Sequence, residues 1–312
     1  MLVVRRQECT MTDRTPLAAL PRYQRPHESP ADPSLEAGEL VPWERVPEVL
    51  AASSLSPGAR ALALGLLRVG TSAVFPGGGA GIEYGSLLKT AVRPDDVGPH
   101  VREAAAHLRE RRVDVLLVPG MSGYPIGAMY ALAAELPAIL LKKTRLTPAE
   151  AEGFPPGAFV IPSYTGDGDV VMSADPAAAL DIVDRVCERQ LAAQQDAPRL
   201  RLTLRCAGAD DIIDKATMSQ AVGESAMVIG NAALADWLER HRAVTGDDRP
   251  ADLRVEIAAW AAPLIKSYNR PQEALRRWFG IEAFAGLTVT GLRLDPPALG
   301  IEGAGLLAFR PR

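Results

Sequence analysis

The sequence predicts an α/β fold with a mainly parallel sheet flanked by helices. Short apolar runs alternate with segments of helical periodicity through most of the 312 residues, which is typical of parallel strands joined by crossover helices. The run at residues 113–118 is almost entirely apolar and enters a Pro-Gly turn, as expected of a strand buried on both faces of a sheet. A hydrophobic content of 47% supplies enough apolar side chains for a sizeable core.

The spacing of apolar residues predicts the order of the elements. It is helical from residue 47 until a glycine-rich stretch at 77–81 interrupts it. Helices are predicted over residues 97–112, 125–136, 175–194, 219–240 and 271–279. Strands are predicted at residues 113–118, 138–141, 200–206, 253–265, 287–294 and 306–309. Ligands of such sheets bind beyond the carboxyl ends of the strands, so the turns after residues 118, 141 and 206 are candidate sites.

Two segments lack regular periodicity. Residues 1–45 are rich in charge and contain six prolines, so we expect a mostly disordered extension, followed by one folded domain over residues 46–312. Residues 144–168 are polar and rich in Gly and Pro. This stretch is too long for an ordinary connection and is expected to form a mobile loop.

Composition excludes several classes of protein. With 34 Lys and Arg against 38 Asp and Glu, the net charge is −4, which makes bulk nucleic-acid binding unfavourable. The longest nearly apolar run, residues 257–265, is too short to span a bilayer, so no membrane association is expected. Three scattered cysteines, Cys9, Cys187 and Cys206, exclude a disulfide framework and a cysteine-based zinc site. Together with the absence of a recognisable signal peptide, they predict a cytoplasmic location.

Two of the candidate turns are suited to an anion. Residues 119–123 (Pro-Gly-Met-Ser-Gly) join a buried strand to a helix, and small residues there let backbone amides and the positive helix end approach an anion. A plain tight turn is the alternative. Lys142, Lys143 and Arg145 follow the next strand, where cations suit a diphosphate leaving group. A solvated charge cluster is the alternative.

The third turn carries acids. Asp210 and Asp211 follow a strand and lead through small residues into the helix that begins near Ser219. Carboxylates in this position can hold sugar hydroxyls or a Mg²⁺ ion, while amides and hydroxyls of the next turn hold a phosphate. An Asp-rich helix N-cap is the alternative.

In this order, the three turns resemble those of the type I phosphoribosyltransferases, most closely the xanthine and adenine phosphoribosyltransferases and the effector domain of the purine repressors. The resemblance runs from about residue 87 to residue 309. Residues 113–128 look like the family's first strand and pyrophosphate loop, and residues 141–148 look like its Arg-Lys strand end. Residues 163–173 resemble the flexible catalytic loop and its returning strand, and residues 210–219 resemble the signature loop for phosphoribosyl pyrophosphate.

The resemblance implies a fold, an activity and a role for each segment. The expected fold includes a small hood, and the expected activity is the Mg²⁺-dependent transfer of the phosphoribosyl group to a purine base with release of pyrophosphate. Asp210 and Asp211 would hold the ribose hydroxyls, directly or through Mg²⁺, while Ser163 and Tyr164 would close over the site. The binding residues implied are Gly120, Met121, Ser122, Gly123, Lys142 and Lys143 for pyrophosphate, Asp214, Lys215, Ala216, Thr217, Met218 and Ser219 for the 5-phosphate, and Lys266 near the base. The resemblance also implies a homodimer.

The chain departs from the family pattern in its signature loop. The loop contains no glycine between residues 210 and 219, so a left-handed conformation there would strain Ala216. Lys215 could compensate by meeting the phosphate directly. Residues 200–205 alternate apolar with cationic or polar side chains, which predicts that one face of this strand is not buried.

Other functions therefore remain open at this point. One is a non-catalytic regulator or sensor that binds phosphoribosyl pyrophosphate or a nucleotide through a degenerate signature loop. A DNA-binding repressor is disfavoured because residues 1–86 contain no clear helix-turn-helix. A structural protein that keeps only the fold is a third possibility. In an alternative register, residues 169–175 would be the strand before a shortened, non-functional loop.

Overall fold

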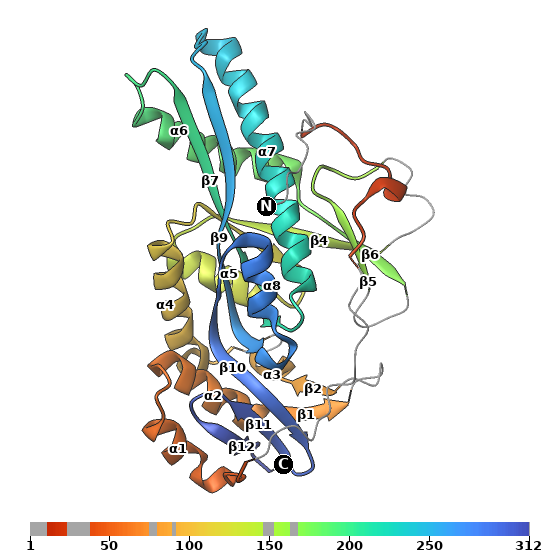
Figure 1. Cartoon of the computed structure of the whole chain (residues 1–312), viewed down its shortest axis with the longest axis vertical. Coiled ribbons are helices and arrows are strands. Elements are labelled where there is room, and N and C mark those ends of the chain that lie inside the picture. Colours follow the sequence, from red (N-terminus) through yellow and green to blue (C-terminus); the bar gives the residue numbers. More distant parts are fainter. Residues whose placement is uncertain are drawn as a thin grey trace.

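The computed structural model describes residues 11–23, 38–74, 80–88, 92–145, 153–162 and 168–311. Within them a ten-stranded sheet has the order β12-β11-β10-β9-β7-β3-β4-β6-β5, with β8 paired to β9 (Figure 1). The strands of this sheet are β3 (Val115–Pro119), β4 (Ala138–Arg145), β5 (Phe159–Pro162), β6 (Asp169–Ser173), β7 (Leu200–Ala209), β8 (Ile212–Ile213), β9 (Ala251–Lys266), β10 (Ala283–Leu294), β11 (Pro297–Ile301) and β12 (Gly305–Ala308). A separate pair contains β1 (Thr71–Val74) and β2 (Ala80–Glu83).

The centre of the sheet is parallel, as the sequence predicts. Neighbouring strands from β10 through β9, β7 and β3 to β4 run parallel, while β6 and β5 on one side and β11 and β12 on the other add antiparallel pairs. The helices are α1 (Val46–Ala52), α2 (Pro57–Val69), α3 (Gly85–Leu88), α4 (Pro94–Glu110), α5 (Tyr124–Ala134), α6 (Pro176–Ala192), α7 (Thr217–Thr245) and α8 (Pro271–Phe279). The helices and strands expected between residues 97 and 309 are confirmed, with ends that differ by a few residues. The helical structure expected up to residue 77 is wrong for residues 71–74, which form β1.

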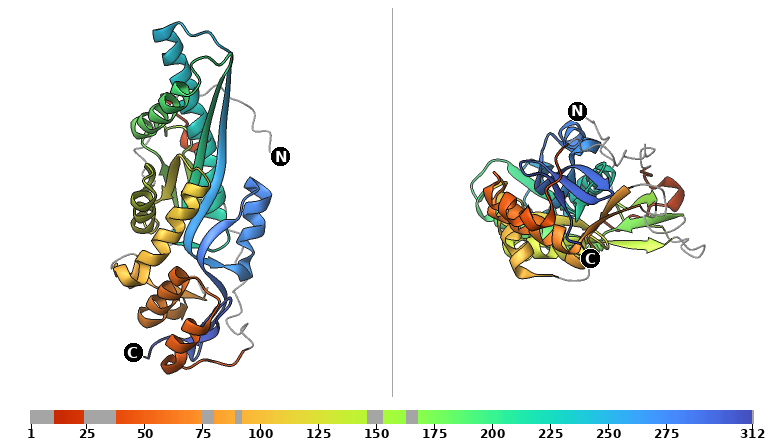
Figure 2. Two further views of the ribbon diagram at one scale, coloured as in Figure 1. Left: turned by 90° about the vertical axis from the view of Figure 1, so that its left-hand side faces the viewer. Right: turned by 90° about the horizontal axis from the view of Figure 1, so that it is seen from below.

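Two apolar cores lie on the two faces of the sheet. Val115 and Leu117 of β3 face the core formed with α6, α7 and α8, whereas Leu116 and Val118 face the core formed with α2, α4 and α5. The side chains of these four residues are at most 2% exposed. A strand covered on both faces must be apolar on both, which explains the nearly continuous apolar run. Figure 2 shows helices on each side of the sheet.

The two crossovers that flank β3 and β7 run in opposite directions. The chain leaves β3 through α5 and returns as β4 on one side, whereas it leaves β7 through α7 and returns as β9 on the other. The two crossover helices also pack on opposite faces. The adjacent strands β3 and β7 therefore form a topological switch point, where a crevice opens at the carboxyl ends of the strands.

The outer half of β7 extends past its neighbour β3, which pairs only with residues 206–208. In Figure 1, β7 and β9 rise together beyond the rest of the sheet, with α6 and α7 beside them. Leu200, Leu202 and Leu204 are buried, while Arg201 on the other face is exposed. The prediction that one face of this strand is not buried is confirmed.

Two glutamines of α6 cover the free edge of this half-strand. The side-chain amide of Gln190 donates to the carbonyl of Thr203 at 2.6 Å and its oxygen accepts from the N–H of Thr203 at 2.9 Å. Gln194 makes the same pair of bonds with the backbone of Arg201, at 2.9 and 2.8 Å. The amides thus replace a neighbouring strand and satisfy an edge that would otherwise be open to pairing.

Parts of the N-terminal segment contact the domain. The backbones of Thr15 and Phe154 exchange two hydrogen bonds of 2.8 Å, and the N–H of Tyr23 donates to the carbonyl of Val160 at 3.0 Å. The side chain of Leu20 is buried against Val160 of β5 and Val171 of β6. Contacts with the domain are therefore present from residue 11 onward, while residues 1–10 and 24–37 of the expected extension lie outside the described residues.

The small hood of the predicted fold is formed by α1, α2, α3 and the β1–β2 pair. Of these, α2, β1 and β2 pack against β10 or β11, while α1 and α3 pack against α2. The hood lies at the end of the molecule that holds the C-terminus (Figure 1). The outer parts of α2 and α4 are joined by a salt bridge between Arg68 and Asp96. In the part of the chain that the structure describes, no helix has the length and apolar character needed to cross a bilayer.

The buried imidazole of His100 in α4 makes stability depend on pH. Burial lowers the pKa of His100 from 6.5 to about 4, and its Nε2 bonds the hydroxyl of Tyr130 at 2.5 Å. Because the unfolded chain takes up this proton below pH 6.5 and the folded chain does not, stability is complete above that pH and is lost as the pH falls toward 4.

We therefore expect the free energy of unfolding to fall by about 2–3 kcal/mol from this group between pH 7.5 and pH 4.5. Urea unfolding at the two pH values measures it. The His100→Gln variant keeps a donor for Tyr130 and cannot titrate. Its free energy of unfolding should therefore fall by about 2–3 kcal/mol less than that of the wild type over the same pH range. Equal losses in the two proteins would rule out His100 as the source.

Candidate functional site

The turn after β3 is held against the end of β4. The N–H of Gly120 donates to the carbonyl oxygen of Leu141 at 3.1 Å, and the hydroxyl of Tyr124 donates to the same oxygen at 2.7 Å. A Cβ on Gly120 would lie 2.6 Å from the hydroxyl of Tyr124, so the close packing requires glycine. The peptide bond between Gly120 and Met121 is cis. Burial raises the pKa of Tyr124, which keeps its phenol a donor.

The turn after β7 meets the turn after β3 directly. A Cβ on Gly123 would lie 3.0 Å from Oδ1 of Asp210 and 2.8 Å from the carbonyl oxygen of Pro119. The carboxylate of Asp210 therefore lies against the backbone of the first turn, at the N-terminal end of α5. Two of the three turns expected to carry chemistry form one surface at the switch point.

Both adjacent acids are nearly buried, and each is oriented. Asp210 is 8% exposed and Asp211 is 3% exposed. The N–H of Asp211 donates to Oδ1 of Asp210 at 2.9 Å, while Oδ2 of Asp211 accepts from the hydroxyl of Tyr84 at 2.7 Å. Buried carboxylates need such donors to offset their lost hydration.

Tyr84 is a site residue that sequence reasoning missed. It lies between β2 and α3 in the hood, 127 positions before Asp211, and its side chain is 5% exposed. No local pattern marks it, because the contact exists only after the hood has folded onto the sheet. Through Tyr84 the hood fixes the orientation of an acid at the switch point.

The loop that follows the acids adopts the conformation that the sequence marks as strained. Ala216 has φ +59° and lies at the N-cap of α7, which is the left-handed conformation that would strain a residue other than glycine. A left-handed alanine costs about 1–2 kcal/mol relative to the right-handed form. Its methyl group is buried in the core below α7. Since alanine offers no capping oxygen, the first amides of α7, at Thr217, Met218 and Ser219, have no partner from the N-cap side chain.

The cations divide into two groups. Lys142 is exposed and Lys143 is half-buried, and both lie in β4 directly after Leu141. They therefore follow the residue whose carbonyl accepts hydrogen bonds from Gly120 and Tyr124. Lys266, at the end of β9, is only 6% exposed, and its Nζ is 2.8 Å from Oδ2 of Asp214. The ammonium expected near a base is thus paired with an acid of the signature loop.

Part of the predicted site falls outside the described residues. This applies to Ser163 and Tyr164 and to residues 146–152 and 163–167 of the expected mobile loop. Within the described part of that stretch, residues 159–162 form β5, so the expectation of a loop is wrong there. In the alternative register, residues 169–175 would be the strand before a shortened loop. Residues 169–173 do form a strand, β6, but it is antiparallel to β4, whereas β7, which leads to Asp210 and Asp211, is parallel to β3.

The acids do not form a complete metal site on their own. Among the described residues, no group of three or more His, Cys, Asp or Glu side chains is placed to hold a metal ion. Asp210 and Asp211 supply two carboxylates at most. That number fits Mg²⁺, which is commonly held by one or two carboxylates together with substrate phosphates and water.

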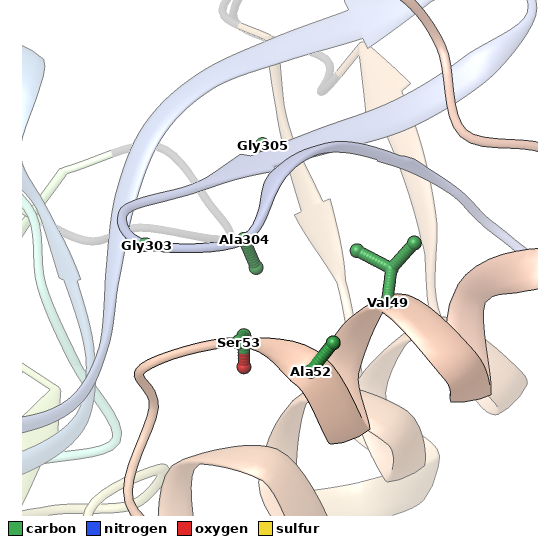
Figure 3. A pocket seen from close by; sticks show the side chains of 6 residues that line it. All are labelled: Val49, Ala52, Ser53, Gly303, Ala304 and Gly305. Atoms are coloured by element: carbon green, nitrogen blue, oxygen red, sulfur yellow. The ribbon is translucent and has the colours of Figure 1, made fainter.

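A hollow of about 450 Å³ is lined by residues that belong to none of these turns. Figure 3 shows it between the end of α1 and the β11–β12 turn, lined by Val49, Ala52, Ser53, Gly303, Ala304 and Gly305. None of these side chains can titrate or carry a charge. The residues suited to chemistry are at the switch point instead.

Comparisons with known proteins give remote similarity to phosphoribosyltransferases. No family model and no curated protein matches the chain. Among solved structures, the chain is similar to the APRTase from Giardia lamblia complexed with 9-deazaadenine, at 13% identity over 73% of this chain and 96% of that chain, with a TM-score of 0.44. Adenine phosphoribosyltransferase from Saccharomyces cerevisiae gives 14% identity, 74% and 98% coverage, and a TM-score of 0.42. Orotate phosphoribosyltransferase from Aeropyrum pernix gives 13% identity, 73% and 92% coverage, and a TM-score of 0.33. With likeness this remote, function has to be argued from the geometry of the site.

Proposed function

We propose that this protein is a Mg²⁺-dependent purine phosphoribosyltransferase that uses phosphoribosyl pyrophosphate. One observation carries the proposal: Gly123 and Asp210 lie side by side at the switch point, where a Cβ on Gly123 would be 3.0 Å from Oδ1 of Asp210. An amide-rich turn suited to an anion therefore adjoins two buried carboxylates. A ligand with a sugar between two phosphate groups matches this arrangement, because anion donors and hydroxyl acceptors alternate along it.

In the proposed reaction, the bond from ribose C1 to pyrophosphate breaks and a bond from C1 to a purine nitrogen forms, while that nitrogen loses its proton. The amides of Gly120, Met121, Ser122 and Gly123 would bind pyrophosphate, and Lys142 or Lys143 would neutralise it. The transition state carries positive charge on the ribose, so positioning and nearby carboxylates supply most of the stabilisation. The amides of residues 214–219 would hold the 5-phosphate.

Asp210 and Asp211 are the residues that would hold Mg²⁺ or the ribose hydroxyls. The ion would supply positive charge that offsets the charge of pyrophosphate. Tyr84 keeps one oxygen of Asp211 occupied. This fixes which oxygens of the pair face the ligand.

A second candidate is a regulator or sensor that binds the same ligand without turnover. The observation that favours it is the signature loop, which has Ala216 in a left-handed conformation where the family has small, glycine-containing sequence. Pyrophosphate release distinguishes the two candidates, because only the enzyme produces it.

Substitution of the acid pair tests the shared ligand. In Asp210→Asn/Asp211→Asn, side-chain shape is kept while both negative charges are removed, so we expect the affinity for phosphoribosyl pyrophosphate with Mg²⁺ to fall at least ~100-fold. Isothermal titration calorimetry measures the loss, and circular dichroism checks the fold. Asp184→Asn, on α6, is the matched control and should bind as the wild type does. Undiminished binding by the double variant would refute this site.

We also propose that the chain forms a homodimer through α5. This helix contains no charged residue, yet its outer face is open: Leu132 is 81% exposed, and nearby Met121 and Leu140 are 73% and 45% exposed. A helix that is apolar all round is normally covered. Glu135 follows the C-terminal end of α5, and Lys142 lies in β4 near the edge where α5 begins. Two copies with antiparallel α5 helices would bring these opposite charges together, which favours a second copy as the occupant.

Leu132→Glu should convert this dimer to a monomer, because a two-fold axis places the new charge in the interface twice. Sedimentation velocity measures the mass. Val244→Glu is the matched control, since Val244 is 86% exposed at the end of α7, and it should leave the mass unchanged. A monomeric wild type, or a Leu132→Glu variant of wild-type mass, would contradict the proposal.

A cytoplasmic location is part of this proposal. The two described cysteines, Cys187 and Cys206, are buried and unpaired. Burial raises the pKa of both thiols, which keeps them protonated and unreactive. Free thiols of this kind are typical of a reducing compartment.

A further inference from the structure

The end of β9 is in register with the signature loop. β8 pairs in parallel with β9, with Ile212 opposite Leu264 and Ile213 opposite Ile265. The next residues in this register are Asp214 and Lys266. Their side chains meet, with Nζ of Lys266 2.8 Å from Oδ2 of Asp214.

Asp214 is held on its other oxygen as well. The 3₁₀ turn Ser267–Asn269 follows β9 directly and brings the side-chain amide of Asn269 to Oδ1 of Asp214, to which it donates. The hydroxyl of Ser267 donates to the carbonyl of Val289 at 3.0 Å, which fixes the turn to β10. Both oxygens of Asp214 are therefore bound by residues from β9 and the turn after it.

Asp214 is an unfavourable residue in a loop that receives a phosphate. Its negative charge would repel the ligand and weaken binding unless a cation compensates it at close range. The Lys266 side chain is 8% exposed, so its attraction to Asp214 is only weakly screened by solvent. The pair also restrains the chain two residues before Ala216. Strained backbone persists where surrounding contacts determine it.

We propose that Lys266 is a positioning residue that acts through Asp214: it cancels the charge of this acid and holds residues 212–216 in the shape that receives the 5-phosphate. This inference rests on the proposed function for its ligand. Lys266 does not contact the base or the phosphate in this account. The loop has no glycine to adopt its conformation without strain. In this account the side-chain bonds of the Lys266–Asp214–Asn269 cluster hold the turn in that conformation instead.

A charge-balanced pair of variants separates this role from direct ligand contact. Lys266→Met leaves Asp214 as an uncompensated acid, so the Kd for ribose 5-phosphate should rise about tenfold or more. Lys266→Met/Asp214→Asn removes both charges and keeps an amide that Asn269 can bond. Its Kd should return to within about threefold of the wild-type value, because the repulsion is gone. The titrations are made by calorimetry without Mg²⁺, so that binding of the ion by Asp210 and Asp211 does not contribute to the measured Kd.

Arg249→Met is the matched control, because it breaks a partly buried ion pair with Asp247 before the start of β9, at the end opposite Lys266. Its melting temperature should fall while its Kd stays at the wild-type value. If the double variant binds as weakly as Lys266→Met, the lysine contacts the ligand itself and the proposal is wrong. An unchanged Kd in Lys266→Met would overturn it equally.

Hydrogen exchange without ligand tests the same role independently of the proposed function. Lys266→Met should speed amide exchange across residues 212–218 about tenfold or more, and Arg249→Met should not. Unchanged exchange in Lys266→Met would overturn the positioning role. If the wild type binds no ribose 5-phosphate but exchange responds as expected, the proposed function fails while the restraint of the loop by Lys266 stands.

Discussion

The contact between Gly123 and Asp210 is the constraint on which the site depends. It exists because β3 and β7 are neighbours in the sheet while their crossovers run to opposite sides, through α5 and α7. The two turns leave the same edge of the sheet and meet at the switch point. With any side chain at residue 123, the first turn would have to move away from the acid.

Long-range donors make the buried acids possible. A carboxylate with little exposure loses its hydration and needs donors in its place. Asp211 receives one from Tyr84 of the hood, and Asp214 is held by Lys266 and Asn269. The hood and the end of β9 are therefore part of the site, although neither carries a recognisable motif. A disturbance in either would change the orientation of an acid at the switch point.

The positions of the turns could be predicted from the sequence, but the partners of their residues could not. Apolar runs mark the strands, and the end of a parallel strand fixes where a turn must lie, so residues 120–123 and 210–216 were placed by local pattern alone. The strain at Ala216 was also readable, since the loop has no glycine. In contrast, Tyr84 and the pairing of Lys266 depend on the register of β8 with β9 and on how the hood docks. The glutamine cover on β7 likewise depends on where α6 lies.

The most direct test of a single phosphoribosyl pyrophosphate site at the switch point is to titrate the purified protein with this ligand and Mg²⁺. Pyrophosphate is then measured after adding adenine, guanine, hypoxanthine or xanthine in turn. The account predicts saturable binding at one site per chain, followed by pyrophosphate release with one of the bases. Binding without release would identify the sensor. Absence of binding would contradict the claim that these turns form one site for this ligand.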